Sequence, residues 1–153
     1  MTINPISKKL GIKPGMHALI VGAPQGYLKL IAPLPEGVAV SDEIAGTHEF
    51  VQLFANRKSE ITKSAPLLLK HAARGALVWI TYPKKTSGVE SDLSREEVWD
   101  AMSATGWRPV TQIAIDEVWS GLRFRPAEDV KKKVGHSVKA ALLILRIPGD
   151  SYF

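Results

Sequence analysis

The feature that most constrains the fold is an apolar run at residues 76–80, bounded by Gly75 and Pro83. The run lacks the polar alternation of a strand with one wet face, so it predicts a strand that is buried on both faces. Such strands lie in the middle of parallel sheets, and ligands usually bind at the carboxyl ends of those strands. The sequence therefore predicts an α/β fold with a ligand-binding edge near the two lysines that follow Pro83.

The composition favours one small domain. With 153 residues, 45% of them hydrophobic, the chain can bury a single sizeable core. It has no cysteine, no apolar run of membrane-spanning length and no secretory signal at its start. We therefore expect a cytoplasmic protein without disulfides and without a membrane partner.

The net charge of +5 comes largely from lysine clusters at residues 8–9, 84–85 and 131–133. Runs of this kind usually form solvated faces. No stripe of aromatic residues and arginines accompanies them, so a nucleic-acid partner is not favoured. The four histidines occur singly, without the spacing of metal ligands, so no metal site is predicted.

Strands and helices alternate along most of the chain. We expect a lead-in at residues 1–15, a domain at residues 16–126, and an extension at residues 127–153 that is first basic and then apolar. Within the domain, the expected strands are residues 18–21, 37–40, 50–55, 76–82, 109–115 and 118–124, and the expected helices are residues 27–32, 61–72 and 95–105. This order predicts a single-domain Rossmann-like fold: a mostly parallel sheet with helices on both faces and a C-terminal antiparallel hairpin.

Local signals indicate where the helices begin and end. Asn56 is expected to cap the helix that follows it, Pro66 to kink that helix or begin a second one, and Gly75 to close it. Ser94 has the spacing of a capping box with the glutamate three residues later, and Gly106 is expected to end that helix.

The apolar run at residues 140–145 in the extension has two interpretations. It fits either a further strand or a short helix, and periodicity does not decide between them. As an uncovered strand it would invite pairing with a second copy of the chain, which gives a possible homodimer through the C-terminal extension.

Several stretches resemble a known family: KPG at 13–15, APQGY at 23–27, YPKKTSGV at 82–89 and DEVWSGLRF at 116–124. They are similar to the signature stretches of a small bacterial domain family of unknown function (DUF3052), over residues 8–125. The order of elements is also similar to the second half of class I S-adenosylmethionine (SAM)-dependent methyltransferases. The resemblance implies a compact methyltransferase-like fold with no established activity and one helix–strand unit fewer than the full enzyme fold.

The resemblance also implies where a cofactor would bind. Such methyltransferases usually carry an acidic residue in the first strand, a glycine-rich loop after it, and a carboxylate after the second strand for the ribose hydroxyls of SAM. The corresponding positions here are Ile20, a loop interrupted by Pro24, and Asp42. With one of three features kept, we predict no cofactor, and SAM enters only under the alternative of an atypical methyltransferase.

Polar residues gather where the predicted strands end. Loops after parallel strands meet at one edge of the sheet, and this edge would collect Gly22, Gly26, Asp42, Lys84, Lys85, Ser87, Asp116, Glu117 and Trp119. Free amides near the glycines, together with the lysines, would suit an anionic group. A structural interpretation is open for each: tight packing for the glycines, solvation for the lysines, a turn for the acidic pair and the core for the tryptophan.

Three functions follow from this pattern. The leading hypothesis is a non-catalytic binding or regulatory module, whose small anionic ligand or protein partner meets the edge near Lys84 and Asp116. If Lys84 is solvent-exposed and serves a ligand, Lys84→Ala should leave melting nearly unchanged. An atypical methyltransferase instead requires an open cavity beside Gly22 and Asp42, not filled by Tyr27 or Pro24. The third possibility is a weak polyanion or nucleic-acid binder that works through the lysine clusters.

Overall fold

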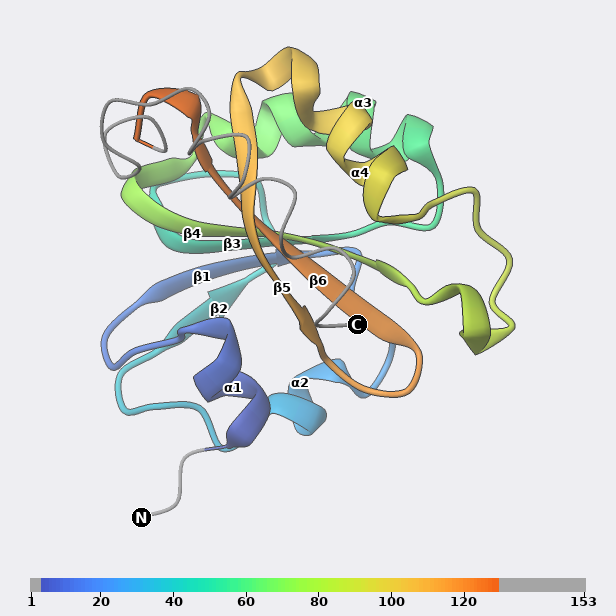
Figure 1. The fold of residues 1–153 in the computed structure, drawn as a ribbon. Helices are drawn as coiled ribbons and strands as arrows, with labels where there is room; N and C mark the ends of the chain where they lie inside the picture. The colour runs from blue at the N-terminus through green and yellow to red at the C-terminus, as the bar shows by residue number, and fades with distance from the viewer. Residues whose placement is uncertain (1–3, 130–153) are drawn as a thin grey trace.

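The structure is a computed structural model that describes residues 4–129. Its strands are β1 (His17–Val21), β2 (Ala39–Ser41), β3 (His48–Phe54), β4 (Ala72–Pro83), β5 (Trp107–Ala114) and β6 (Trp119–Pro126). They form one sheet in the order β2-β1-β3-β4-β6-β5 (Figure 1). The first four strands pair in parallel, and β6 is antiparallel to both β4 and β5. The predicted α/β fold with its C-terminal hairpin is confirmed.

Helices cover both faces of the sheet. They are α1 (Pro5–Leu10), α2 (Tyr27–Ile31), α3 (Lys58–Leu69) and α4 (Arg95–Met102), with single 3-10 turns η1 (Lys85–Ser87) and η2 (Ser103–Thr105). The longer pair, α3 and α4, lies on one face, and the short helices α1 and α2 lie on the other (Figure 1). The helices on the face of α1 and α2 are therefore shorter than those on the opposite face.

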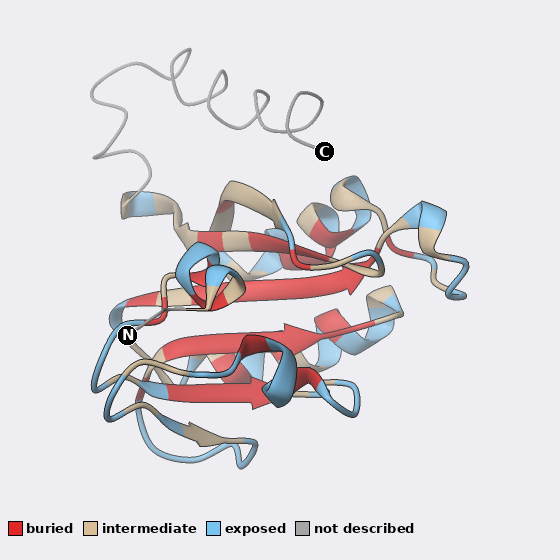
Figure 2. Ribbon diagram, turned by 90° about the horizontal axis from the view of Figure 1, so that it is seen from below, coloured by how far each residue is buried: buried red, intermediate tan, exposed pale blue. Residues whose placement is uncertain are grey.

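Each face has its own hydrophobic core because side chains alternate across the strands. In β4, Val78 and Ile80 belong to the core under α3 and α4, whereas Trp79 belongs to the core under α1 and α2. Trp79 is 1% exposed, and its indole Nε1 donates to the carbonyl oxygen of Leu10 at 3.0 Å, which ties α1 to the sheet. Figure 2 shows that the buried residues follow the central strands. The apolar run is thus buried on both faces, as the sequence predicts.

The helix before β4 ends earlier than expected. α3 stops at Leu69 and β4 begins at Ala72, so Gly75 lies inside a strand and does not close the helix. The pairing of β3 with β4 shifts between its first two registered pairs, and the extra residues of β4 bulge out of the ladder. Gly75 has a φ of 78° in this bulge, a conformation that glycine adopts without strain. Pro66 lies within α3 and does not divide it.

The start of α3 also differs from the expectation, because the N-cap is Arg57 and not Asn56. The carboxylate of Glu60 accepts the amides of both Asn56, at 2.7 Å, and Arg57, at 2.9 Å. In α4 the predicted cap is confirmed: the Ser94 hydroxyl accepts the amide of the glutamate three residues later at 3.3 Å. Gly106 follows η2 with a φ of 82°.

Two further expectations concern the ends of elements and of the chain. The second strand was expected at residues 37–40, and β2 covers Ala39–Ser41. The run at residues 140–145, and the homodimer proposed to form through it, lie outside the described residues. Within residues 4–129, no helix is both long and apolar enough to cross a membrane.

Candidate functional site

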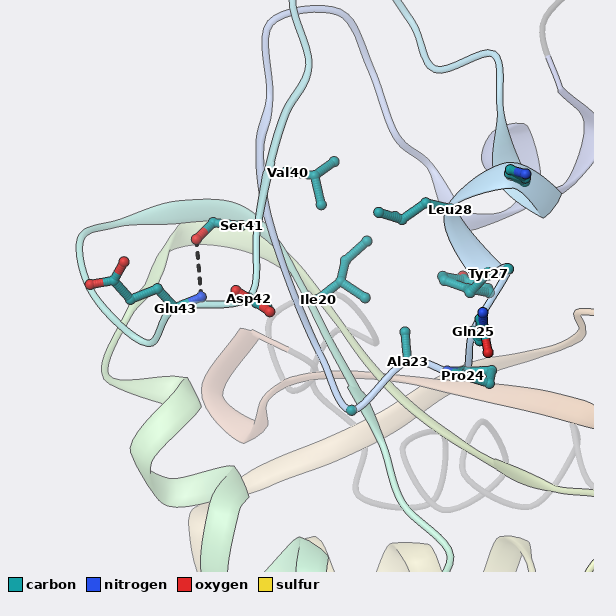
Figure 3. A pocket seen from close by; sticks show the side chains of 13 residues that line it. Ile20, Ala23, Pro24, Gln25, Tyr27, Leu28, Val40, Ser41, Asp42 and Glu43 are labelled. Carbon is teal, nitrogen blue, oxygen red and sulfur yellow. Dashed lines mark hydrogen bonds between the residues drawn. The ribbon is translucent and has the colours of Figure 1, made fainter.

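A cleft of about 810 Å³ lies where β1 and β2 end at the carboxyl edge of the sheet (Figure 3). Its volume is within the range of small-molecule sites, roughly 300–1,000 Å³. Figure 3 shows Ile20, Leu28 and Val40 facing one another across its apolar part, with Asp42 beside them. The residues that line it are Ile20, Gly22, Ala23, Pro24, Gln25, Gly26, Tyr27, Leu28, Lys29, Val40, Ser41, Asp42 and Glu43.

The turn from β1 to α2 forms one wall of the cleft, and its two glycines have different environments. Gly22 has a φ of 79°, and a Cβ on it would lie 2.9 Å from the carbonyl oxygen of Phe54, so a side chain does not fit there. Gly26 has a φ of 89°, yet a Cβ on it would meet nothing within 4 Å. Tight packing thus accounts for Gly22, whereas Gly26 faces open space.

Tyr27 is turned into the protein and leaves the cleft open. It is 3% exposed, and its hydroxyl donates to the side-chain oxygen of Gln52 at 3.0 Å. The side-chain nitrogen of Gln52 donates in turn to the hydroxyl of Thr81 at 2.9 Å. Burial raises the pKa of Tyr27 well above its usual value, the bond to Gln52 acts in the opposite direction, and the charge of Asp116 raises it further. The hydroxyl therefore stays protonated and fixes the start of α2.

The opposite wall of the cleft follows β2. The hydroxyl of Ser41 accepts the amide of Glu43 at 3.0 Å, which shapes a tight turn around Asp42. Asp42 is exposed, and its carboxylate has no hydrogen bond or ion pair within the described part of the chain. It is therefore available to accept hydrogen bonds from a ligand. Lys29 adds a positive charge to the lining.

Lys84 and Asp116 meet at the same edge, but they do not form an ion pair. The ammonium of Lys84 donates to the backbone carbonyl of Asp116. The Asp116 carboxylate accepts the amides of Val118 and Trp119, both at 2.8 Å. Asp116 is thus a turn residue, and Lys84 closes that turn.

The remaining predicted residues lie around this turn. Lys85 is exposed and lines a smaller hollow of about 350 Å³ beside α4, and the Ser87 hydroxyl donates to the carbonyl of Lys84 at 2.7 Å. Glu117 is exposed at the tip of the hairpin. Trp119 is partly buried and packs edge to face on Phe54 of the core, with ring centroids 5.1 Å apart.

The structure therefore divides the predicted residues into two groups. Gly22, Gly26 and Asp42 line the cleft, and the residues around Lys84 and Asp116 form a separate turn. The rings of Tyr27, Phe54 and Trp119 contact one another edge to face in a row that connects the two groups. The apolar walls and Lys29 were not predicted from the sequence, in which Ile20 and Val40 have the same pattern as core residues of a strand. Among residues 4–129, no cluster of His, Asp or Glu could hold a metal ion.

No family model and no curated protein matches the sequence, so the resemblance to DUF3052 gains no support. Solved structures do match the fold. The structure of a DhpI–SAH complex has a TM-score of 0.57 at 12% identity, over 80% of this chain and 83% of that one.

Two further structures have the same fold. The ribosomal protein L11 methylase from Lactobacillus delbrueckii subsp. bulgaricus has a TM-score of 0.53 at 12% identity, over 79% of this chain and 74% of that one. A TehB-like SAM-dependent methyltransferase from Corynebacterium glutamicum has a TM-score of 0.52 at 10% identity, over 79% and 87%. At these identities the likeness establishes a methyltransferase-like Rossmann fold.

The comparisons correct one prediction. The sequence predicts no cofactor, because two of three cofactor-binding features are missing. The chain nevertheless has the fold of SAM-dependent methyltransferases, including a protein whose structure contains SAH. The interrupted loop also leaves the cleft open, since Pro24 lies on its wall and Tyr27 points inward. The expectation of no cofactor is wrong.

Proposed function

We propose that the protein binds SAM in the cleft between the β1–α2 turn and Asp42 and acts as a SAM-dependent methyltransferase. The observation that carries this proposal is the open cleft at the carboxyl ends of β1 and β2, with an unpartnered carboxylate on its rim. Ligands of open α/β sheets bind in this position. The similarity to methyltransferases supports the proposal, but it is a similarity of fold alone.

The lining residues fit the parts of SAM. Ile20, Leu28 and Val40 offer apolar walls to the adenine ring, and the Asp42 carboxylate is placed to accept hydrogen bonds from the ribose hydroxyls. We assign the amino-acid end of SAM to the turn before α2. There the amides of Gln25 and Gly26 have no acceptor in the part of the chain that the structure describes.

When bound, SAM supplies an electrophilic methyl group on a sulfonium. The part that we assign to this chain is to bind and orient the cofactor through both walls of the cleft. The non-catalytic module that the sequence favoured is now the weaker hypothesis, because it depended on an eroded cofactor site. The cleft is instead open and its acidic residue is free.

Isothermal titration calorimetry with SAM and with SAH, its demethylated product, tests the proposal. We expect one molecule to bind per chain, and Asp42→Asn to weaken binding by about tenfold or more, since one pair of hydrogen bonds to a charged group is lost. Glu36→Gln is the matched control, because Glu36 is exposed, makes the same charge change and does not line the cleft.

Absence of binding of either compound at millimolar concentration would refute the proposal. Equal affinity of wild type and Asp42→Asn for SAM would show that Asp42 does not contact the cofactor, and would overturn the placement of the ribose beside it. Transfer of labelled methyl from SAM to a cellular extract, retained by Glu36→Gln and lost by Asp42→Asn, would extend binding to catalysis.

A further inference from the structure

Three arginines lie on one face of the β5–β6 hairpin. Arg123 pairs with Trp79 of β4, and so it shares the face of Trp79, on the side of α1 and α2. Arg125 is two residues further along β6 and faces the same way. Arg108 of β5 pairs directly with Arg125. The hairpin thus presents an arginine cluster, defined as Arg108, Arg123 and Arg125.

The cluster has no acidic partner. None of the three guanidinium groups forms an ion pair or a side-chain hydrogen bond within residues 4–129, and the buried Nε of Arg123 has no acceptor. Burial lowers the pKa of Arg123, and the positive charge of Arg125 lowers it further. Like charges directly opposite on neighbouring strands destabilise a sheet, as at Arg108 and Arg125. An anion bound between them would relieve that repulsion.

The cluster lies on the face of the sheet that carries the shorter helices. Within residues 4–129, the helices on this face are the six-residue α1 and the five-residue α2, and α1 is held over β4 by the bond from Trp79. Lys9, at the end of α1, donates to the carbonyl of Ala114, which lies at the opposite end of β5 from Arg108. The SAM cleft is elsewhere, because β3 and β4 separate β1 from β6 in the sheet.

We propose that the arginine cluster binds the phosphate backbone of a nucleic acid. The planar guanidinium can donate two parallel hydrogen bonds to the oxygens of one phosphate. It is also more weakly hydrated than a lysine ammonium, so losing water on binding costs less free energy. Backbone contacts of this kind do not require base-specific groups. The overall charge of +5 has the sign that such binding needs.

An acidic protein surface fits the cluster less well. Protein interfaces have an apolar core with a polar rim. The exposed large hydrophobic residues of the described chain lie outside the hairpin: Leu28, Leu30, Ile44, Leu67 and Val89. The sequence that follows, residues 130–153, holds five basic residues and a single acidic one, Asp150, so its charge does not complement the arginines.

The test is fluorescence anisotropy with a labelled single-stranded RNA of about 12 nucleotides, within the usual site size. Arg108→Gln/Arg125→Gln is compared with Lys63→Gln/Lys70→Gln, which removes two exposed charges from α3 and its C-cap on the opposite face. We expect the arginine variant to lose about tenfold in affinity near 100 mM salt. The slope of log K against log salt should fall by about 1.4, which corresponds to two phosphate contacts on a single strand.

The lysine variant should bind like the wild type. Melting of the arginine variant should occur no lower than that of the wild type, since a repulsive pair is removed, so lost binding is not lost folding. Equal loss in both variants, or no RNA binding by the wild type at micromolar concentration, would overturn the proposal. So would arginine-dependent binding of polyglutamate without binding of RNA.

Discussion

The hydroxyl of Tyr27 donates a hydrogen bond to the side-chain oxygen of Gln52, 3.0 Å away, beneath the floor of the cleft. Gln52 and its own acceptor, the Thr81 hydroxyl, are both fully buried. Three elements, α2, β3 and β4, are thereby joined by a polar chain inside an apolar core. This chain decides the direction of the Tyr27 ring, and with it whether the cleft is open.

Tyr27→Phe should lower the free energy of unfolding by about 1–3 kcal/mol, because it leaves the buried oxygen of Gln52 unpaired. Urea unfolding near pH 7 measures this loss. Tyr82→Phe is the control: Tyr82 is 4% exposed, and its hydroxyl has no hydrogen-bond partner within the described residues. Its loss should be smaller, within about 1 kcal/mol. Equal losses would mean that the bond to Gln52 contributes nothing.

Tyr82 should make the protein less stable at alkaline pH. Burial raises its pKa, the charge of Arg95 acts in the opposite direction, and the charge of Glu96 raises it further. An unfolded tyrosine releases its proton near pH 10, whereas the folded protein still holds it, so the free energy of unfolding falls as the pH rises above about 10. Urea unfolding at about pH 8 and pH 10.5 should show a smaller fall for Tyr82→Phe than for wild type. Parallel pH profiles would contradict this.

Alanine at the two glycines of the β1–α2 turn should have unequal effects. Both have positive φ, so each substitution introduces backbone strain of about 1–2 kcal/mol. Gly22→Ala also forces a Cβ against the Phe54 carbonyl, whereas Gly26→Ala meets nothing. Gly22→Ala should therefore destabilise by about 3 kcal/mol or more, and Gly26→Ala by strain alone. Thermal or urea unfolding checks the order, and the reverse order would show that the turn relaxes around Gly22.

The fold could be predicted from the sequence because its signals are local. The apolar run around Trp79, the alternation in the closing hairpin and the capping serine Ser94 each report the structure of their own segment. Gly75 was misassigned because a glycine in a bulge has the same left-handed conformation as one at a helix end. Asn56 was misassigned because the amide of Lys58, which it could have capped, donates instead to the carboxylate of Asp92, 34 residues along the chain.

The openness of the cleft could not be read from the sequence. It depends on Tyr27 pointing inward, and the groups that hold it, Gln52 and Phe54, come from a strand 25 residues or more away. The arginine cluster could not be predicted from the sequence either, because it also depends on contacts between separate strands. Arg108 meets Arg125 only through the hairpin register, which includes an irregularity between Pro109 and Thr111. Register of this kind is a property of the folded sheet.

Lys84 and Lys85 should differ in their effect on stability although they are neighbours. The ammonium of Lys84 is half-buried and closes the turn at Asp116, whereas Lys85 is exposed with no hydrogen bond or ion pair from its side chain in the described part of the chain. Lys84→Ala should therefore lower the free energy of unfolding by about 1–2 kcal/mol, the contribution of a hydrogen bond from a charged donor that still touches water. Lys85→Ala should stay within about 0.5 kcal/mol of the wild type. Urea unfolding of both variants tests this difference. The expectation from the sequence was instead that Lys84 is solvent-exposed and that Lys84→Ala leaves melting nearly unchanged. Matching stabilities for the two variants would show that the bond to Asp116 does not hold the hairpin turn.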